Sequence, residues 1–438
     1  MATGKSVWDR LIWTWDPKST REAGDSVVRN LLLHWFPAKV TRTSLSFGYS
    51  FWLGSIAALL FAVLSITGVI LMFLYIPSVE RAYPSVKDIE FAVSYGWFVR
   101  ALHRIAAQLM VAIAVLHMVR VFLCGAYRNG TATNQNRPLN WIIGLVLLLV
   151  TFLLSFTGYL LPWDQLAYWA VTVGTNIASA APLIGDSLRF FLLGGRQIDQ
   201  NTLIRFYVLH CFLLPTVVLL LFSWHMWRVR KDGGLACVDA ASLKQRYEAR
   251  APALEKTYSL LGITRGRTVH VQTSLVDFDR FTVDSSPNLT RRLLLVMIAT
   301  LVVCSVLSLV MATPLEEPAN PKVTPNPAKA PWYFLWLQEL VTDTTVRLGG
   351  FTINGALIGG ILIPGVIVLV LALWPYFDRS SIDSVGVWFG SGRRGQNTAF
   401  LIGFAVVILL TIIGTFLRGP SWKFFWPWEA WPEIPTRF

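Results

Sequence analysis

Long runs of apolar residues divide the chain and predict its architecture. Each run approaches the roughly 20 residues that an α-helix needs to cross the hydrocarbon core of a bilayer. The runs lie at about 52–76, 96–124, 140–161, 203–228, 292–312, 352–374 and 399–417. This pattern predicts an all-α membrane protein with seven transmembrane helices.

The polar segments between the runs divide the chain into parts. Residues 1–50 contain two stretches that are typical of amphipathic helices lying on the membrane surface. Residues 231–290 form a long charged connection, which we expect to pack against the same surface. This connection separates a four-helix bundle, residues 51–230, from a three-helix unit, residues 291–438.

Two segments on the opposite side are too apolar for plain loops. Residues 163–200 are interrupted by Pro, Gly and Asp, which predicts short helices along the surface. Residues 313–350 begin with a proline-rich stretch, where proline enforces an extended path, and continue into WYFLWLQELV, a short amphipathic helix. We expect both segments to cover one pocket that opens to lipid.

The composition agrees with a membrane protein. Of the 438 residues, 54% are hydrophobic and 14% are charged, whereas soluble domains contain about 25% charged residues. The net charge of +13 follows from topology rather than from nucleic-acid binding, because an N-terminus in the cytoplasm places most Lys and Arg on that side. The cysteines form no CxxCH motif for a c-type haem and no disulfide framework. They are Cys124, Cys211, Cys237 and Cys304.

Four of the six histidines lie inside apolar runs, where a polar side chain is costly. His103 and His117 are fourteen residues apart, which corresponds to a rise of roughly 21 Å and a return to within about 40° of one helix face. His210 and His225 are fifteen residues apart, which corresponds to about 22 Å and about 60°. If the two helices run antiparallel, His103 faces His210 near one surface and His117 faces His225 near the other.

Two facing imidazoles are the axial ligand set of a haem iron. A single intramembrane histidine is more often a hydrogen-bonded packing residue, but packing gives no reason for a matched interval on two helices. We therefore predict two haems about 20 Å apart, with His103, His117, His210 and His225 as the iron ligands. With both axial positions filled, such a group transfers single electrons and does not bind oxygen.

Paired glycines on two other runs share the fourteen-residue interval. They are Gly54 and Gly68 in the first run, and Gly144 and Gly158 in the third. Alone they favour tight helix packing, whereas in phase with the histidines they indicate walls for a flat ligand. Alternating helix directions give two levels, each with two glycines and two histidines. The levels are Gly54, His117, Gly144 and His225, and Gly68, His103, Gly158 and His210.

Two arginines lie three residues from a predicted ligand, Arg100 before His103 and Arg120 after His117. That spacing places each guanidinium on the ligand's own helix face. Haem propionates are anionic, so both arginines are candidates to bind them. Anchoring at the membrane interface explains such arginines as well.

Several strings resemble the cytochrome b family of quinol:cytochrome c and plastocyanin oxidoreductases. They occur in the family order and cover nearly the whole chain: GWFVRALHR, LLSFTGYLLPWDQLAYWAVTVGTNI, TLIRFYVLHCFLLP and PNPAKAPWYFLWLQ. The resemblance implies that His103 and His210 bind a low-potential haem near the outer face. It implies that His117 and His225 bind a high-potential haem near the cytoplasm. It also assigns both arginines to the propionates.

The family oxidises quinol at an outer site, passes one electron to a Rieske iron–sulfur protein and sends the other across two b haems to an inner quinone site. The resemblance implies that this chain is the cytochrome b subunit of such a quinol:cytochrome c or similar oxidoreductase, working by a Q cycle with proton translocation. It implies partners as well: a Rieske protein, a c-type cytochrome or other periplasmic acceptor, and a second copy in a larger complex of the bacterial cytoplasmic membrane.

The resemblance also locates two quinone pockets. The outer pocket contains Tyr168, Gly174, Pro331, Trp332 and Tyr333. The inner pocket lies at the end of the fourth run, where acid–base and hydrogen-bonding groups are expected. These are Arg230, Lys231 and Asp232.

Departures from the family pattern change three expectations. The usual Pro-Glu-Trp-Tyr reads Ala330-Pro331-Trp332-Tyr333, so the glutamate that accepts a quinol proton is absent, and Glu339 is the nearby substitute. Such a change resembles lineages that use a lower-potential quinone such as menaquinone. Trp52 stands where the plastid-type subunit has a cysteine that tethers an extra haem. The three spans after the charged connection resemble the shorter second subunit of the plastid-type complex, so the whole chain resembles the two plastid-type pieces fused in one bacterial chain.

Two other functions stay open at this point. A di-haem membrane anchor of a dehydrogenase or hydrogenase would pass electrons to quinone without bifurcation, and it would need only four or five spans and no Pro-Trp-Tyr segment. A haem-free transporter would use the histidines as proton relays. Transporters often contain paired broken helices from an inverted repeat, and the sequence shows none.

Overall fold

The computed structural model describes residues 39–130, 135–232, 255–259, 268–272, 282–349 and 351–431. The predicted surface helices before residue 39, Cys237 and most of the charged connection lie outside the described residues.

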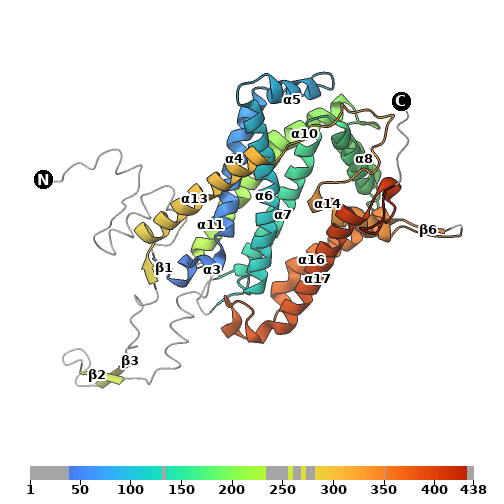
Figure 1. Cartoon of the computed structure of the whole chain (residues 1–438). Helices are drawn as coiled ribbons and strands as arrows, with labels where there is room; N and C mark the ends of the chain where they lie inside the picture. Colours follow the sequence, from blue (N-terminus) through green and yellow to red (C-terminus); the bar gives the residue numbers. More distant parts are fainter. Residues whose placement is uncertain are drawn as a thin grey trace.

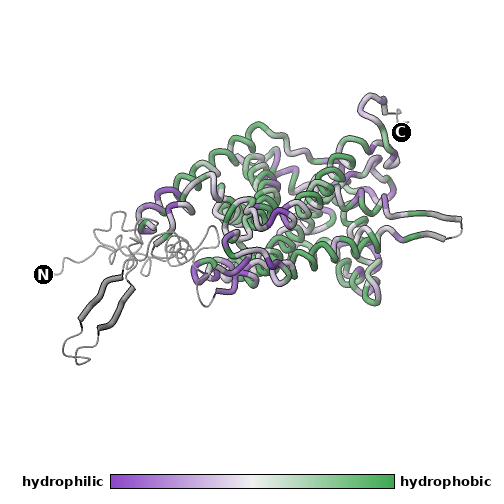
Figure 2. Tube along the Cα trace, turned by 90° about the horizontal axis from the view of Figure 1, so that it is seen from below, coloured by the Kyte–Doolittle hydropathy of each residue, from purple (hydrophilic) through white to green (hydrophobic). Residues whose placement is uncertain are grey.

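Seven of the described helical segments are long and apolar enough to cross a membrane. They are Leu53–Met72, Gly96–Leu123, Arg137–Leu160, Gln200–Lys231, Pro287–Val310, Gly355–Phe377 and Ser391–Leu417. Many of their large apolar side chains are exposed, among them Leu220, Leu295 and Val366, which suits lipid and not water. Figure 2 shows the hydrophobic residues along the helices and the hydrophilic ones mainly on the connections. The prediction of an all-α membrane protein with seven spans is confirmed.

The first four spans form a bundle (Figure 1). Its helices are α4 (Leu53–Met72), α6 (Gly96–Leu123), α7 (Arg137–Leu160) and a composite fourth span. The fourth span consists of α10 (Gln200–Val208), a π-helical turn (Leu209–Leu213) and α11 (Leu214–Lys231). Because consecutive spans alternate in direction, residues far apart in sequence meet at the same level.

Short helices lie at one end of the bundle, which we call the outer end. They are α5 (Ala82–Phe91), α8 (Gln165–Ser179), α9 (Gly185–Leu193) and α14 (Trp332–Asp343). The predictions of short helices in residues 163–200 and of a helix in WYFLWLQELV are therefore confirmed. We call the opposite end, with the α6–α7 loop, the inner end; α3 (Phe47–Ser50) leads into α4.

The helices after the charged connection do not form one group. The first, α13 (Ser285–Val310), packs on α4 and α6 of the bundle, where Cys304 joins a core with Leu60 and Ile105. The others pack around α14 at the far side of α7. These are α15 (Gly355–Leu357), a π turn (Ile358–Leu362), α16 (Ile363–Phe377), α17 (Arg394–Ile412) and a second π turn (Ile413–Leu417).

The strands are short and pair antiparallel. They are β1 (Lys39–Thr41) with β4 (Thr282–Asp284), β2 (Glu255–Ser259) with β3 (Thr268–Gln272), and β5 (Val346–Leu348) with β6 (Phe351–Ile353). In the first pair Val40 lies opposite Val283, which ties the entry of α4 to the entry of α13. Single 3-10 turns complete the described elements at Thr43–Leu45, Ile382–Ser384, Ser391–Arg393 and Pro420–Trp422.

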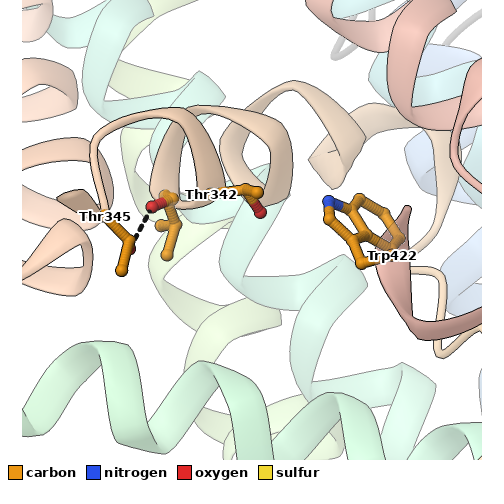
Figure 3. A pocket seen from close by; sticks show the side chains of 4 residues that line it. Thr342, Thr345 and Trp422 are labelled. Atoms are coloured by element: carbon orange, nitrogen blue, oxygen red, sulfur yellow. Dashed lines mark hydrogen bonds between the residues drawn. The ribbon is translucent and has the colours of Figure 1, made fainter. Parts of the chain in front are cut away.

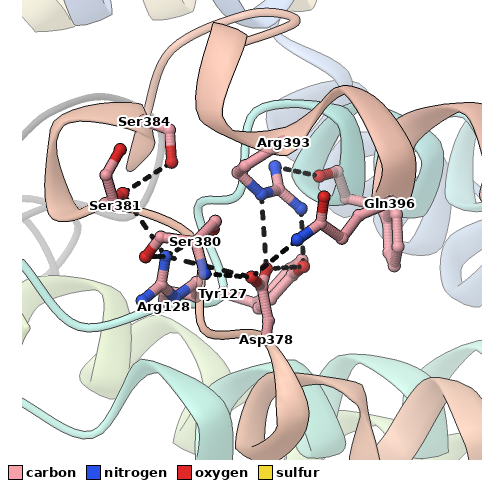
Figure 4. A network of polar contacts seen from close by, with 9 residues as sticks. Tyr127, Arg128, Asp378, Ser380, Ser381, Ser384, Arg393 and Gln396 are labelled. Atoms are coloured by element: carbon pink, nitrogen blue, oxygen red, sulfur yellow. Dashed lines mark hydrogen bonds and ion pairs between the residues drawn. The ribbon is translucent and has the colours of Figure 1, made fainter.

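A buried polar network joins the bundle to the C-terminal helices at the inner end (Figure 4). Tyr127 donates to Asp378 at 2.6 Å, and the fully buried Arg393 donates to Asp378 at 3.3 Å and to the Tyr127 oxygen at 2.5 Å. Nearby, Arg128 donates to the carbonyl of Ser380 at 2.5 Å. Burial raises the pKa of Asp378, but hydrogen bonds from Tyr127 and Ser380 and the Arg393 charge outweigh it and hold the pKa below its usual value. The loop after α6 is thereby fastened to the α16–α17 loop.

Candidate haem-binding sites

The structure brings the four intramembrane histidines together as two pairs. The ring centres of His103 and His210 are 6.2 Å apart, and those of His117 and His225 are 6.5 Å apart. The rings are nearly perpendicular, at 76° and 83°. Imidazole nitrogens bind a transition metal at about 2 Å, zinc being the reference, so two opposed ligands place their ring centres about 6 Å apart. Both pairs have the separation that one shared metal requires.

A π-helical turn explains why fifteen residues serve on the fourth span where fourteen serve on α6. The turn at Leu209–Leu213 contains His210 and holds one more residue than an α-helical turn. It therefore absorbs the extra residue, so that His210 and His225 point to the same side of the bundle. Pro215 is the local cause, because it offers no N–H to the carbonyl of Cys211 and its ring clashes with that carbonyl.

Each histidine lies against the glycine predicted at its level. A Cβ added to Gly54 would be 3.3 Å from the His117 ring, and one added to Gly68 would be 3.3 Å from the His103 ring. A Cβ on Gly144 would be 3.5 Å from His225, while one on Gly158 would collide with His210. The missing side chains leave room beside the rings, and a flat ligand between the rings needs that room.

The outer pair carries a defined proton arrangement. Thr67 donates its hydroxyl proton to the carbonyl of Val63 at 2.7 Å, so its oxygen is free to accept from Nδ1–H of His103 at 2.8 Å. His210 donates from Nδ1 to the carbonyl of Leu154 at 3.0 Å. With the proton on Nδ1, the Nε2 lone pair of both rings is available to a metal.

Polar groups without partners mark the inner pair. Both amide atoms of the fully buried Asn140 have no hydrogen-bond partner in the part of the chain that the structure describes, and Nδ1 of His225 has no side-chain partner there. Asn140 lies four residues before Gly144, and its backbone is adjacent to the His225 ring. Sequence reasoning missed Asn140, although its distance from Gly144 was a readable signal.

The donor set fits haem better than a bare metal ion. No group of three or more His, Cys, Asp or Glu side chains suited to a metal occurs among the described residues. Two imidazoles are too few ligands for an isolated ion, which usually takes at least about four. A haem iron needs only axial ligands from the protein, and the glycines give its ring space.

The predicted propionate arginines have protein partners. Arg100 forms an ion pair with Glu90 of α5 at 2.6 Å and donates to the carbonyl of Thr313 at 2.9 Å. Arg120 is buried, stacks over the Tyr49 ring at 4.8 Å and points its Nε at the Tyr49 carbonyl at 3.4 Å. Both stay at the ends of the bundle near their histidines.

Two of the predicted outer pocket residues, Gly174 and Tyr333, lie against aromatic rings of α7. The Phe156 ring packs against Gly174 of α8, and a Cβ at residue 174 would collide with this ring. Tyr333, in the first turn of α14, has its ring 6.5 Å from that of Phe152. Its neighbours at the helix start are Pro331, the N-cap residue, and Trp332, which is partly exposed. Tyr168 of α8 packs its ring on Trp163 and Trp169.

Glu339, the substitute carboxylate that the sequence suggested, is held in an ion pair. It is 1% exposed, and its Oε1 and Oε2 accept from Nε of Arg418 at 2.9 and 3.0 Å. Arg418 also contacts Asp343 at 3.3 Å. With both oxygens engaged, Glu339 fastens α14 to the end of the last span.

A shallow hollow of about 560 Å³ lies beside this ion pair (Figure 3). It is lined by Val341, Thr342, Thr345 and Trp422. Figure 3 shows the Trp422 indole across from Thr342. None of the predicted site residues lines this hollow.

A buried carboxylate that the sequence reasoning missed lies at the outer end. Asp164 caps α8 by accepting from the backbone N–H of Ala167 at 2.9 Å, and it accepts from the N–H of Glu316 at 3.3 Å. Burial raises its pKa above the usual value, despite these hydrogen bonds and the nearby Arg104 and Arg100. Burial raises the pKa of Tyr333 as well, against a hydrogen bond from Ser155 and the charge of Arg104. The charged and titratable groups around Asp164 are Tyr83, Arg100, Arg104, Tyr159 and Glu316.

The predicted inner pocket residues separate in the structure. Asp232 is fully buried, pairs with Arg228 at 2.8 Å and accepts from the N–H of Asn136 at 3.1 Å. Lys231 is exposed and stacks over the Trp227 ring at 5.0 Å, while Arg230 is half-buried. Arg228 was overlooked, although it follows His225 by three residues as Arg120 follows His117.

Two family models match the chain. The one described as Cytochrome b/b6/petB matches residues 38–233, and the one described as Cytochrome b(C-terminal)/b6/petD matches residues 318–426. The cytochrome b6 of Prochlorococcus marinus strain NATL1A is 39% identical over 181 residues, which are 41% of this chain and 80% of that protein. The cytochrome b6 of strain AS9601 matches to the same extent.

A solved structure shares the fold. The chain described as Hyperthermophilic respiratory Complex III superposes with a TM-score of 0.65 and 24% sequence identity, and the match covers 86% of this chain and 86% of that one. A match of this extent includes helices on both sides of the charged connection.

Proposed function

The chain belongs to the cytochrome b family, and on this basis we propose that it is the cytochrome b subunit of a quinol oxidoreductase with two b-type haems. The observation that carries the proposal is the arrangement of two histidine pairs at two levels of one bundle, each beside two glycines. A di-haem anchor would account for the bundle alone. It would not account for α16 packed against α7, nor for the rings of Tyr333 and Phe334 in α14 beside Phe152 of α7.

A bis-histidine haem accepts and releases one electron at a time without an open axial position. The residues of this chain hold it and tune it differently at the two levels. Thr67 and the Leu154 carbonyl accept from the outer histidines, and such hydrogen bonds raise the basicity of a ligand. A more basic ligand stabilises oxidised iron, which supports a low potential at the outer level. At the inner level the charge of the buried Arg120 acts on His117, and His225 faces only the backbone of Asn140, which supports a high potential there.

Quinol oxidation releases protons together with electrons, so the outer pocket needs a proton acceptor. Asp164 is buried at the outer end of the bundle, and Tyr159 lies within electrostatic reach of both Asp164 and Tyr333. Both oxygens of Glu339, by contrast, are engaged by Arg418. We infer that Asp164 takes the place of the family's missing glutamate as the acceptor.

The remaining parts of the proposal come from the family. Electrons from quinol divide between a Rieske protein, which passes them to a c-type cytochrome or similar acceptor, and the haems of this chain. The chain works as a homodimer in a larger complex of a bacterial cytoplasmic membrane, with its N-terminus in the cytoplasm. Arg230 and Lys231 serve the inner quinone site, and menaquinone is the expected quinone.

Redox titration of the purified chain tests the proposal. We expect two b-type components of different potential. His103→Ala should leave only the higher-potential component, because it removes an outer ligand, and His117→Ala should leave only the lower-potential one. His270→Ala, in β3 between α11 and α13, is the control and should keep both. A chain without b-type absorbance, or a His103→Ala variant that keeps both components, rules the proposal out.

A further inference from the structure

The inner end of the bundle contains a polar ladder between α7 and α11. Arg228 donates from Nη2 to the carbonyl of Asn136 at 3.0 Å. Four residues further along α7, on the same helix face, Asn140 is fully buried. Four residues further again, a Cβ on Gly144 would touch His225 at 3.5 Å. Asn140 therefore lies between a guanidinium and a predicted iron ligand.

Several polar groups on this ladder have no hydrogen-bond partner within the described ranges. They are Oδ1 and Nδ2 of Asn140 and Nε of Arg228. An unsatisfied buried group costs about 1–3 kcal/mol, and native proteins satisfy nearly all of them. So many unpaired atoms in one place indicate a ligand that hydrogen-bonds to them.

The chemistry of these atoms selects a carboxylate. Nδ2 of Asn140 and Nε of Arg228 can only donate, so a shared partner must be an acceptor. Arg228 pairs with Asp232 through Nη2, which leaves its Nε for a charge-assisted hydrogen bond to that acceptor. The backbone of Asn140 is the hydrogen-bonding group beside His225, so the side-chain amide of Asn140 is left for the ligand. Haem carries two carboxylates on one edge, and charged groups avoid the centre of the bilayer. A haem at the inner level would therefore turn that edge toward the inner end, where the ladder lies.

We propose that Asn140, together with Nε of Arg228, binds a carboxylate of the haem held by His117 and His225. The inference rests on the proposed function, since it needs a haem at this level. The outer level has no equivalent, because the residue fourteen positions along, four before Gly158, is Leu154. The polar site at residue 140 therefore distinguishes the inner haem from the outer one.

Asn140→Leu in the full-length chain tests this inference, because it copies the residue of the outer level and removes both amide atoms. The readouts are the midpoint potentials of both haems and the rate of haem transfer to an acceptor protein in excess. We expect the inner haem to leave about tenfold faster, as for other supporting hydrogen bonds, and its potential to fall, because a less neutralised carboxylate favours oxidised iron. The outer haem should keep its potential and its rate.

Two further variants separate the possible outcomes. Leu154→Ala changes the same face of α7 at the outer level and should leave the inner haem unchanged. Asn140→Gln keeps the amide and should restore much of the native behaviour; it also serves as the test if Asn140→Leu fails to fold. Native rates and potentials in Asn140→Leu, or equal changes at both haems, overturn the inference while both haems still bind. Absence of haem from the native chain instead defeats the proposed function.

Discussion

At the outer level of the bundle, His103 and His210 each have a hydrogen-bond acceptor at Nδ1, whereas at the inner level His225 has only the Asn140 backbone beside its ring. Steric room differs too. A Cβ at Gly158 would collide with His210, but a Cβ at Gly144 would make an ordinary contact with His225. At the outer level little space is left beside the His210 ring, whereas at the inner level the amide atoms of Asn140 are left to bind a ligand.

The difference shows that one set of residues repeats at both levels and provides the iron ligands, while another set differs between the levels and can adjust the haem potentials. The fourteen-residue spacing repeats the histidines and glycines, so both levels present the same ligands. The residues that surround them do not repeat: Thr67 and Leu154 at one level are replaced by Asn140 and Arg228 at the other. Two sites with the same ligands therefore receive different neighbours, which is a way to give them different potentials.

The largest expected effect comes from Gly158, the bundle glycine with the least space for an added Cβ beside its histidine. Gly158→Ala should remove the outer haem, because the new Cβ would push the His210 ring out of line with His103. Gly144→Ala should keep the inner haem, since 3.5 Å is an ordinary contact. The haem content per chain and the potential of the remaining component measure both effects.

Gly365→Ala in α16 is the matched control, because an added Cβ there meets nothing within 4 Å. It should retain both haems. Equal haem loss in Gly158→Ala and Gly144→Ala would contradict the contrast between a closed outer level and a roomier inner one.

Periodicity alone was sufficient to predict the spans and the level of each histidine and glycine. A bilayer requires helices of similar length, and every backbone N–H and C=O inside it must be hydrogen-bonded within the protein. An apolar run of sufficient length therefore predicts a transmembrane helix. The fourth span was the exception, because a regular helix leaves His225 about 60° out of phase with His210. The π turn beside Pro215 removes that error, and its signal was present in the sequence.

Ion pairs between residues that are far apart in the chain could not be predicted from the sequence. Glu339 looked available on a short helix, but Arg418 pairs with it from 79 residues away. The partner depends on how α14 packs on the end of the last span, which no local pattern records. The pairing of Asp232 with Arg228 is different, because the two residues are four apart on one helix. That spacing places both side chains on the same buried face, which the run of residues 230–232 alone does not indicate.

The next effect in size concerns proton release at the outer end. Asp164→Asn should slow quinol oxidation by the assembled complex by about 100-fold, the lower range for a general base. Asparagine caps helices as well as aspartate does, so α8 should keep its start. Because burial holds the Asp164 pKa above its usual value, the native rate should rise with pH as the carboxylate ionises. The variant should lose that rise.

Haem spectra and potentials of Asp164→Asn should match the native chain, which separates a lost proton acceptor from a damaged fold. Glu339→Gln provides the comparison, because it weakens the ion pair with Arg418 and should lower thermal stability without altering the pH dependence of the rate. A Glu339→Gln variant that loses the pH dependence, beside an unaffected Asp164→Asn, would reverse the assignment.

The smallest effect tests the tuning itself. Thr67→Val keeps the shape of the side chain but removes the oxygen that accepts from His103 at 2.8 Å. The hydrogen bond is worth about 1 kcal/mol, which for one electron corresponds to about 40 mV. The outer potential should rise by roughly that amount, because a less basic ligand stabilises oxidised iron less. Thr67→Ser keeps the hydroxyl and should not shift it. The inner potential should stay constant in both variants, since Thr67 neighbours His103 alone of the iron ligands; a shift of both potentials would mean that packing, and not the hydrogen bond, separates the two levels.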